Sequence, residues 1–175
     1  MAALIRRATA DDVEAIARVR IDTWRTTYRG HLPDALLDSL AYDENAEHWR
    51  RGLAAAPPER ITYVAEDAGA VVAFVSAGPE RTGDVVYRGE IYAIYVLDAH
   101  QGRGIGRALT RRAVGDLLAQ GRRSLLIWVL RANAEGRAFY EALGGRAVRE
   151  RADAIEGVPV VEVGYGWEDA APLAR

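Results

Sequence analysis

The sequence predicts a single α/β (α+β) domain, in which a mixed β-sheet of about seven strands is flanked by helices. The hydrophobic spacing switches between strand-like and helix-like segments in the order βαα(α)βββαβαββ. The 175 residues suit one domain, and 50% of them are apolar, which is enough to build a core. We find no repeat, low-complexity tract or linker that would divide residues 1–175.

The N-terminal part of the chain predicts one strand and one long helix. Residues 4–7 are a short strand candidate. Thr9 is a good N-cap, and Asp12 follows at the spacing of a capping box, at the positive end of the helix dipole. Apolar residues then recur at steps of three and four up to about Arg29, and Gly30 ends this amphipathic helix.

Two short helices and three strands are expected next. Pro33 is tolerated in a first helical turn and opens a helix that runs to residue 40. Another helix covers about residues 45–55 and stops before two prolines. The pattern then becomes strand-like and predicts a hairpin followed by a third strand that contains EIYAIYVL, at residues 61–66, 70–77 and 85–97.

The C-terminal part predicts a helix, a strand, a second helix and a hairpin. The first helix covers residues 104–120, and the strand SLLIWVL at residues 124–130 is apolar enough to be buried on both faces. The second helix covers residues 133–143 and ends at a pair of glycines. The hairpin has its turn at Glu156–Gly157, between strands at residues 146–152 and 158–167.

The composition excludes several chemistries. All 23 basic residues are arginine, so there is no Schiff-base lysine and no P-loop lysine; the absence of cysteine removes thiol nucleophiles, disulfides and zinc fingers. A net charge of −2 argues against a nucleic-acid binder, and three scattered histidines make a poor metal site. No apolar run has the length of a signal peptide or a membrane span. We expect a cytoplasmic protein without a metal, nucleic-acid or membrane partner.

The most informative segment is YVLDAHQGRGIGRAL, where a strand leads through a glycine-rich turn into a helix. Glycines in such a turn let the backbone approach a ligand closely, and the first N–H groups of the helix are unpaired at the positive end of its dipole. Four arginines add positive charge here, at positions 103, 107, 111 and 112. The segment therefore predicts a pyrophosphate site; the alternative is a plain connecting turn with solvated arginines.

A dinucleotide-binding Rossmann motif is the first rival interpretation. The GRGIG run lacks the third glycine of GxGxxG, because position 107 is arginine. The acidic residue expected about 20 residues further on is also absent, since residues 124–130 are uninterrupted apolar strand. Both departures disfavour a nucleotide-dependent oxidoreductase.

The same segment resembles the pyrophosphate loop of the GNAT superfamily of acetyl-CoA-dependent N-acetyltransferases. QGRGIG at residues 101–106 is similar to the family's Q/R-x-x-G-x-G/A loop, and Asn133 followed by FYEALGG is similar to its N-x(6)-Y segment. The element order resembles that fold along nearly the whole chain. The resemblance implies a mostly antiparallel sheet whose fourth and fifth strands splay apart around acetyl-CoA.

The resemblance also assigns residues to the cofactor. It implies that the backbone at the end of the fourth strand pairs with the pantetheine arm, that the loop holds the pyrophosphate, and that Asn133 and Tyr140 reach the cofactor from the last helix. The residues concerned are Ile94, Tyr95, Val96, Gly102, Arg103, Gly104, Ile105, Gly106, Arg107, Asn133 and Tyr140.

Acetyl transfer needs an oxyanion donor, an acid for the leaving thiolate and a base for the amine. A backbone N–H near Val96 suits the oxyanion. Tyr140 is the candidate acid, with a core tyrosine as the alternative. Glu90 is the candidate base: strand alternation predicts that it shares a face with Tyr92, Ile94 and Val96, and the alternative is a solvated glutamate. Some family members carry a glutamate where this chain has Trp128, so that form of catalysis is missing.

The acceptor side is the least specific part of the sequence. Trp24, Thr27, Tyr28 and Trp128 are candidate substrate-binding residues, although all of them also suit a core. We expect transfer from acetyl-CoA directly to a primary amine, most simply of a small molecule. The alternatives are a protein N-terminal amine as acceptor and an acyl-CoA sensor without turnover. The resemblance also allows a homodimer.

Overall fold

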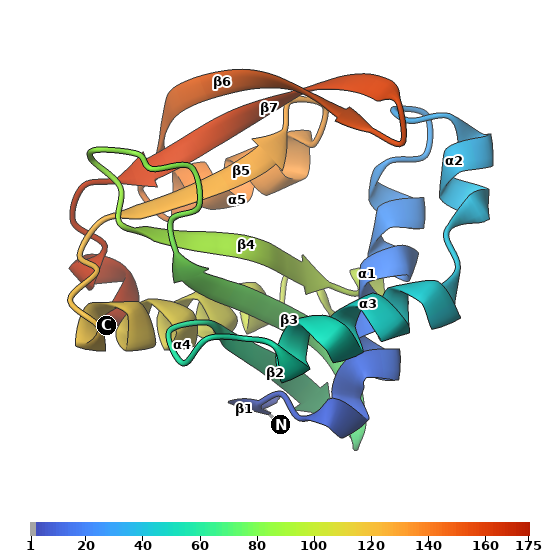
Figure 1. Cartoon of the computed structure of the whole chain (residues 1–175), viewed down its shortest axis with the longest axis horizontal. Helices are drawn as coiled ribbons and strands as arrows, with labels where there is room; N and C mark the ends of the chain where they lie inside the picture. The colour runs from blue at the N-terminus through green and yellow to red at the C-terminus, as the bar shows by residue number, and fades with distance from the viewer. Residues whose placement is uncertain (1–2) are drawn as a thin grey trace.

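The computed structural model describes residues 3–175 and contains a seven-stranded sheet in the order β1-β2-β3-β4-β5-β7-β6 (Figure 1). Neighbouring strands are antiparallel except for the parallel pair β4 and β5. The mixed, mostly antiparallel sheet predicted from the sequence is therefore confirmed. The strands are β1 (Leu4–Arg7), β2 (Ile61–Asp67), β3 (Ala70–Pro79), β4 (Gly89–Val96), β5 (Leu125–Leu130), β6 (Arg146–Ile155) and β7 (Val158–Trp167).

Helices cover both faces of the sheet. The residues of α4 and α5 pack into one core cluster, against strands from β2 to β7, whereas α1 and α3 pack against the opposite face of β2 and β3 (Figure 1). No helix in residues 3–175 is long and apolar enough to cross a membrane. The helices are α1 (Val13–Thr27), α2 (Asp34–Ser39), α3 (Tyr42–Ala54), α4 (Ile105–Ala119) and α5 (Ala134–Ala142).

The observed boundaries depart from the predicted ones in two places that matter. The third predicted strand begins only at Gly89, because residues 80–88 form a loop ordered by Glu80 and Asp84. The sixth strand continues to Ile155, so the final hairpin is longer than expected and its turn is confined to Glu156 and Gly157.

The parallel pairing of β4 and β5 is short. It joins Gly89, Glu90 and Ile91 to Leu125, Leu126 and Ile127, and stops there. β5 continues to pair with β7 along its whole length, and β4 continues to pair with β3. The two strands therefore diverge towards α1 (Figure 1), as the family resemblance implied.

A β-bulge on β4 lies just beyond this point of divergence. Ser76 pairs with Ala93 and Ala77 with Ile91, so Tyr92 has no partner on β3. Such an extra residue breaks the simple alternation of faces along a strand. Ile94 packs in the α4 cluster together with Ile91, although the two residues are an odd number of positions apart.

The bulge overturns the predicted placement of Glu90. Glu90 pairs with Gly78 on β3, and paired residues face the same side of a sheet. A Cβ added to Gly78 would meet the hydroxyl of Tyr92, so Tyr92 lies on that side too, and Glu90 and Tyr92 share a face. Ile94 and Val96 lie on the opposite face, in the α4 cluster, whereas Ala93 packs in the α1 and α3 cluster. Glu90 thus faces α1 and not α4, because alternation is interrupted at the bulge.

The start of α1 is fixed by a buried carboxylate. Asp12 accepts hydrogen bonds from the backbone N–H and the hydroxyl of Thr9, at 2.8 and 3.1 Å, as the capping-box spacing predicted. Its two oxygens also receive both terminal nitrogens of Arg6, each at 2.8 Å. The Arg6 guanidinium holds the pKa of Asp12 below its ordinary value. This ion pair joins β1 to the α1 entry.

We predict that Asp12→Asn lowers the free energy of unfolding by about 2 kcal/mol, because it removes charge-assisted hydrogen bonds at a buried site. A carboxyl with a lowered pKa stabilises the fold above its unfolded pKa of about 4 and loses that contribution as the pH falls through the folded value. The difference between the two proteins in urea denaturation should therefore shrink in acid. Asp11→Asn, at an exposed neighbouring position, is the control and should cost under about 0.5 kcal/mol. An equal loss in both variants would contradict this account.

Candidate active site

A cavity of about 360 Å³ opens where β4 and β5 diverge. Its walls come from α1, β4, β5, α5 and the β6–β7 hairpin, and its size is typical of a site for a small ligand. Eleven of the residues singled out in the sequence line it: Trp24, Thr27, Tyr28, Glu90, Ile94, Tyr95, Val96, Gly106, Trp128, Asn133 and Tyr140. Of the predicted set, Gly102, Arg103, Gly104, Ile105 and Arg107 are not part of its wall.

The inner edge of β4 supplies backbone groups to the cavity. Leu97 donates its N–H to the carbonyl of Val72 on β3, and backbone groups alternate in direction along a strand. The N–H and carbonyl groups of Val96 and Ile94 therefore point away from β3, into the space that β5 has left. The Val96 carbonyl accepts a bond from the Gln101 side chain at 3.0 Å, a contact that the sequence did not reveal.

The glycine-rich turn brings the start of α4 to the same edge. Gly104 caps α4 with φ 80°, a left-handed conformation that glycine adopts without strain. A Cβ on Gly106 would lie 3.3 Å from the Phe139 ring and 3.7 Å from Val96, so a side chain larger than a methyl group would not fit here without displacing them. The side chain of Ile105 is buried in the core and anchors the helix. The N–H groups of this first turn have no intrahelical partner, an arrangement that favours an anion.

Of the two loop arginines, one is engaged within the protein. Arg103 bonds the carboxylate of Asp67 at 2.9 Å and the ring of His100 at 3.0 Å, which ties the loop to the β2–β3 turn. Arg107 is exposed on the first turn of α4. Arg107 therefore carries the more accessible positive charge for a phosphate.

Asn133 connects the two sides of the cavity. Its side-chain oxygen accepts the N–H of Gly136 at 2.8 Å and so caps α5. Its amide nitrogen donates to the hydroxyl of Tyr28 on α1 at 3.3 Å. The role implied by the family resemblance is contact with the cofactor; the contacts within the protein make Asn133 a link between α5 and α1.

Tyr140 lies on α5 and is 7% exposed. Its ring contacts those of Phe139 and Tyr165, at 5.5 and 5.8 Å between centroids, so part of the core interpretation is correct. Burial raises the pKa of its hydroxyl, and the neighbouring Tyr95 and Tyr28 add to the shift. A phenol is protonated at neutral pH even at its ordinary pKa of about 10, and the raised pKa makes Tyr140 a weaker acid. Its place in the cavity wall is what makes it the candidate proton donor.

Glu90 is buried and paired. Its side chain is 2% exposed, which rules out the solvated alternative. Both carboxylate oxygens contact Arg81, at 2.5 and 3.2 Å, and the Arg81 backbone N–H donates to one of them as well. Arg81 also lies over the Tyr92 ring, 4.3 Å from its centroid. The sequence did not indicate Arg81, because it belongs to the irregular loop before β4.

Aromatic rings form the α1 side of the cavity. Trp24 and Tyr28 pack edge to face at 5.2 Å, and both are more than nine-tenths buried. The Trp128 ring lies over Gly164 on the neighbouring strand β7: a Cβ added to Gly164 would come within 3.2 Å of the ring. In residues 3–175, the indole N–H groups of Trp24 and Trp128 and the hydroxyl of Thr23 are buried without a hydrogen-bond partner, so this wall has unused hydrogen-bonding capacity.

The final hairpin contributes two charged residues that the sequence reading missed. Arg151 stacks on Trp128 at 4.1 Å and bonds Glu162 at 2.6 Å. This pair could have been predicted from the sequence, because a two-residue turn at Glu156–Gly157 places residue 151 opposite residue 162 in the hairpin. No cluster of three or more metal-ligating side chains occurs in the part of the chain that the structure describes.

Comparison with known proteins agrees with the fold and identifies the family. The sequence matches the Acetyltransferase (GNAT) family over residues 14–145. It is 39% identical over 171 residues to YuaI, an uncharacterized N-acetyltransferase of Bacillus subtilis (strain 168), covering 97% of this chain and 95% of that protein. The chain therefore belongs to the GNAT family of acetyl-CoA-dependent acetyltransferases.

Solved structures with bound cofactor share this fold. The paia N-acetyltransferase of Thermoplasma acidophilum, in complex with coenzyme A, superposes with a TM-score of 0.71 at 17% identity, over 93% of this chain and 98% of that one. The yncA protein of Salmonella typhimurium, with its cofactor acetyl-CoA, gives 0.68 at 22% identity, over 95% and 94%. At these identities the likeness establishes the fold.

We predict that Arg81→Gln costs about 2 kcal/mol of folding stability, because it leaves the buried Glu90 carboxylate without its partner; the half-exposed arginine keeps the loss below that of a fully buried pair. The double variant Arg81→Gln/Glu90→Gln should recover at least half of this loss in thermal or urea unfolding. Arg88→Gln, an exposed arginine without an ion pair in residues 3–175, is the control. Additive losses in the double variant would show that the pair is not coupled.

Proposed function

We propose that this protein transfers the acetyl group of acetyl-CoA directly to the primary amine of a small molecule. One observation carries the proposal: the cavity between β4 and β5 extends from the α4 N-terminus at Gly106 to the aromatic wall on α1. A thioester and an amine can therefore meet inside one cavity. The chain has no cysteine, which agrees with direct attack, because no thiol could carry the acetyl group.

The residues present fit acetyl-CoA. The backbone groups of Ile94 and Val96 offer an open strand edge to the amide groups of the pantetheine arm, whereas those of Tyr95 point towards β3. Gly102 to Arg107 offer N–H groups and positive charge to the pyrophosphate, and Gly106 adds no side chain of its own beside Phe139 and Val96. Asn133 lines the same cavity from α5.

The chemistry of the site follows from these groups. Bound acetyl-CoA supplies an activated thioester. The Val96 N–H, which has no partner on β5, is placed to stabilise negative charge on the carbonyl oxygen. Tyr140, which is protonated at neutral pH and lines the cavity, would donate its proton to the departing sulfur.

Glu90 is the proposed acceptor of the amine proton. It faces α1, on the acceptor side of β4, and its oxygens are held by Arg81. A carboxylate oxygen has more than one lone-pair site, so a water molecule can still bond it and relay the proton. Trp24, Thr27, Tyr28 and Trp128 would enclose the rest of the acceptor.

Acetyl-CoA at about one hundred times its dissociation constant should raise the melting temperature by roughly 5–10 °C, from about 2.7 kcal/mol of binding free energy. Gly106→Leu should abolish this shift, because the added side chain meets Phe139 and Val96. Gly115→Leu on the same helix is the matched control, since its Cβ would meet nothing within 4 Å. A thermal-shift assay makes the measurement, and an unshifted wild type would refute the cofactor assignment.

Tyr140→Phe should lower kcat by about 100-fold or more while the acetyl-CoA thermal shift stays intact, because only the proton donor is lost. Tyr87→Phe is the control, a buried tyrosine outside the cavity wall. The assay measures release of free CoA with a thiol reagent, which meets no cysteine in this chain. Unchanged turnover in Tyr140→Phe would assign the acid role to another group.

A further inference from the structure

We propose that the acceptor is an amine that also carries an anionic group, as in an amino acid or a related aminocarboxylate, and that arginines stacked on the cavity's aromatic wall recognise the anion. The inference rests on the proposed function and specifies its substrate class. It follows from three features of the acceptor side: the positions of the guanidinium groups, which of them already form an ion pair with a carboxylate, and which carboxylate oxygen has no hydrogen-bond partner.

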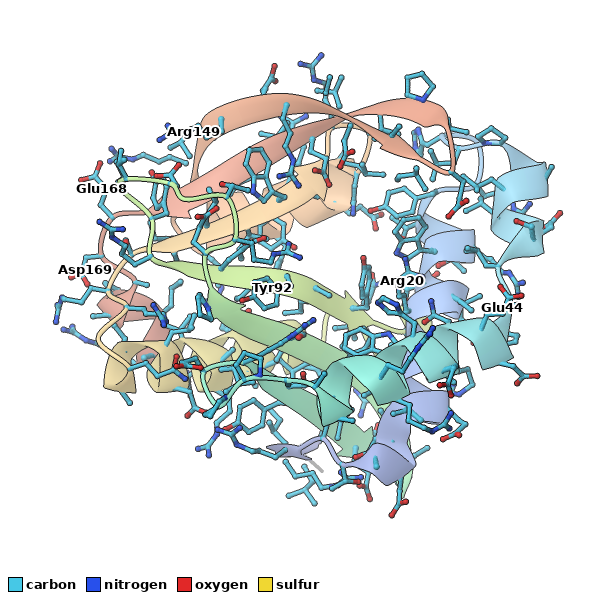
Figure 2. All side chains as sticks on the ribbon, in the orientation of Figure 1. Arg20, Glu44, Tyr92, Arg149, Glu168 and Asp169 are labelled. Atoms are coloured by element: carbon cyan, nitrogen blue, oxygen red, sulfur yellow. The ribbon has the colours of Figure 1, made fainter. Side chains whose placement is uncertain are left out.

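Guanidinium groups lie on three aromatic side chains of the acceptor wall. Arg20 lies 4.6 Å from the ring centroid of Trp24, and Arg151 lies 4.1 Å from that of Trp128. Tyr92 has two such neighbours, Arg81 at 4.3 Å and Arg60 at 5.1 Å. Figure 2 shows Arg20 and Tyr92 on opposite sides of the opening between α1 and β4. Stacking holds the planar cations in place and leaves their N–H edges free to bond.

The positive charges outnumber the negative ones. Arg81 is paired with Glu90 and Arg151 with Glu162. Within residues 3–175, Arg20 and Arg60 have no carboxylate within 4.0 Å, so their charge is not neutralised by an ion pair. Neither arginine is part of the cavity wall itself. Each lies on an aromatic ring that is, Arg20 on Trp24 and Arg60 on Tyr92.

One carboxylate oxygen remains for the amine. Both Arg151 contacts go to Oε2 of Glu162, at 2.6 Å, whereas Glu90 has both oxygens bound by Arg81. Oε1 of Glu162 has no partner within the described residues, and the Glu162 charge raises the pKa of Tyr28 across the cavity. An incoming ammonium can bind this oxygen before it loses its proton.

An acceptor with both charges matches this arrangement better than a plain amine does. A polyamine would bring further positive charge towards Arg20 and Arg60, and the repulsion would oppose its binding. The N-terminus of a protein offers an amide carbonyl where an aminocarboxylate offers an anion. Polyamines and protein N-termini are therefore the competing acceptors that the experiment must distinguish from aminocarboxylates.

The experiment compares matched acceptors with the full-length wild-type protein. Each amino acid of a panel is assayed beside its primary amide and its decarboxylated amine, with acetyl-CoA saturating and CoA release followed by a thiol reagent. We expect kcat/KM for the acid to exceed that for both partners by about tenfold or more, which corresponds to one good ion pair at about 1.4 kcal/mol. The amide tests the charge alone, because it keeps the size and shape of the acid.

Variants then locate the anion. Arg20→Gln and Arg60→Gln should raise KM for the acid, leave kcat within about twofold, and remove the preference over the amide, most fully in the double variant. Arg146→Gln, at an exposed arginine of β6 that lies on none of the rings of Trp24, Tyr92 and Trp128, is the control and should change neither constant. Glu162→Gln should raise KM for the acid and for the amide alike, because both carry the ammonium.

Three outcomes would overturn the proposal: equal or faster turnover of the amides, a preference for di- and polyamines, or acetylation of peptide N-termini ahead of free amino acids. In the first two outcomes a small-molecule amine is still acetylated, so the proposed function stands while the substrate class fails. In the third, acetyl transfer from acetyl-CoA stands, but the small-molecule acceptor fails together with the substrate class. A wild-type protein that releases no CoA with any acceptor, although acetyl-CoA raises its melting temperature, would contradict both.

Discussion

The divergence of β4 and β5 is the constraint on which the rest of the molecule depends. Backbone N–H and carbonyl groups in a protein interior need partners, yet β4 loses its β5 partner beyond Ile91. β3 and β7 remain paired to the two diverging strands, so the sheet stays continuous around the opening. The unpaired edge is therefore held rigidly in place, and an extended ligand backbone can complete it.

The bulge at Tyr92 makes this opening useful on both faces of the sheet. Before the bulge, Glu90 faces α1; after it, Ile94 and Val96 face α4. Without the extra residue, alternation would place Glu90, Ile94 and Val96 on one face. The added residue places the Glu90 carboxylate on the face opposite to the side chains of Ile94 and Val96. In the proposed reaction, the base would therefore lie on the acceptor side of β4.

The elements of the fold could be predicted from the sequence, but the orientation of Glu90 could not. Local spacing predicted the five α-helices and seven strands of residues 3–175, because amphipathic periodicity and the glycines and prolines that end an element are features of neighbouring residues. The glycine loop was equally readable, since its chemistry lies within QGRGIG. The face of Glu90 was not, because it depends on the register between β3 and β4. Arg81 lies in an irregular loop with no periodicity, whereas the Arg151–Glu162 pair was accessible from the hairpin turn.

The exclusive use of arginine has a chemical consequence at such a site. A positive wall built from lysine would place ε-amines beside an activated thioester, and a lysine desolvated there loses its proton readily. Each would be a competing acceptor. A guanidinium stays protonated at any pH at which the enzyme can work, so it binds anions without offering a nucleophile. Stacking on Trp24, Tyr92 and Trp128 also limits its motion. The cavity can thus be positively charged at its wall and still react only with the amine that enters it.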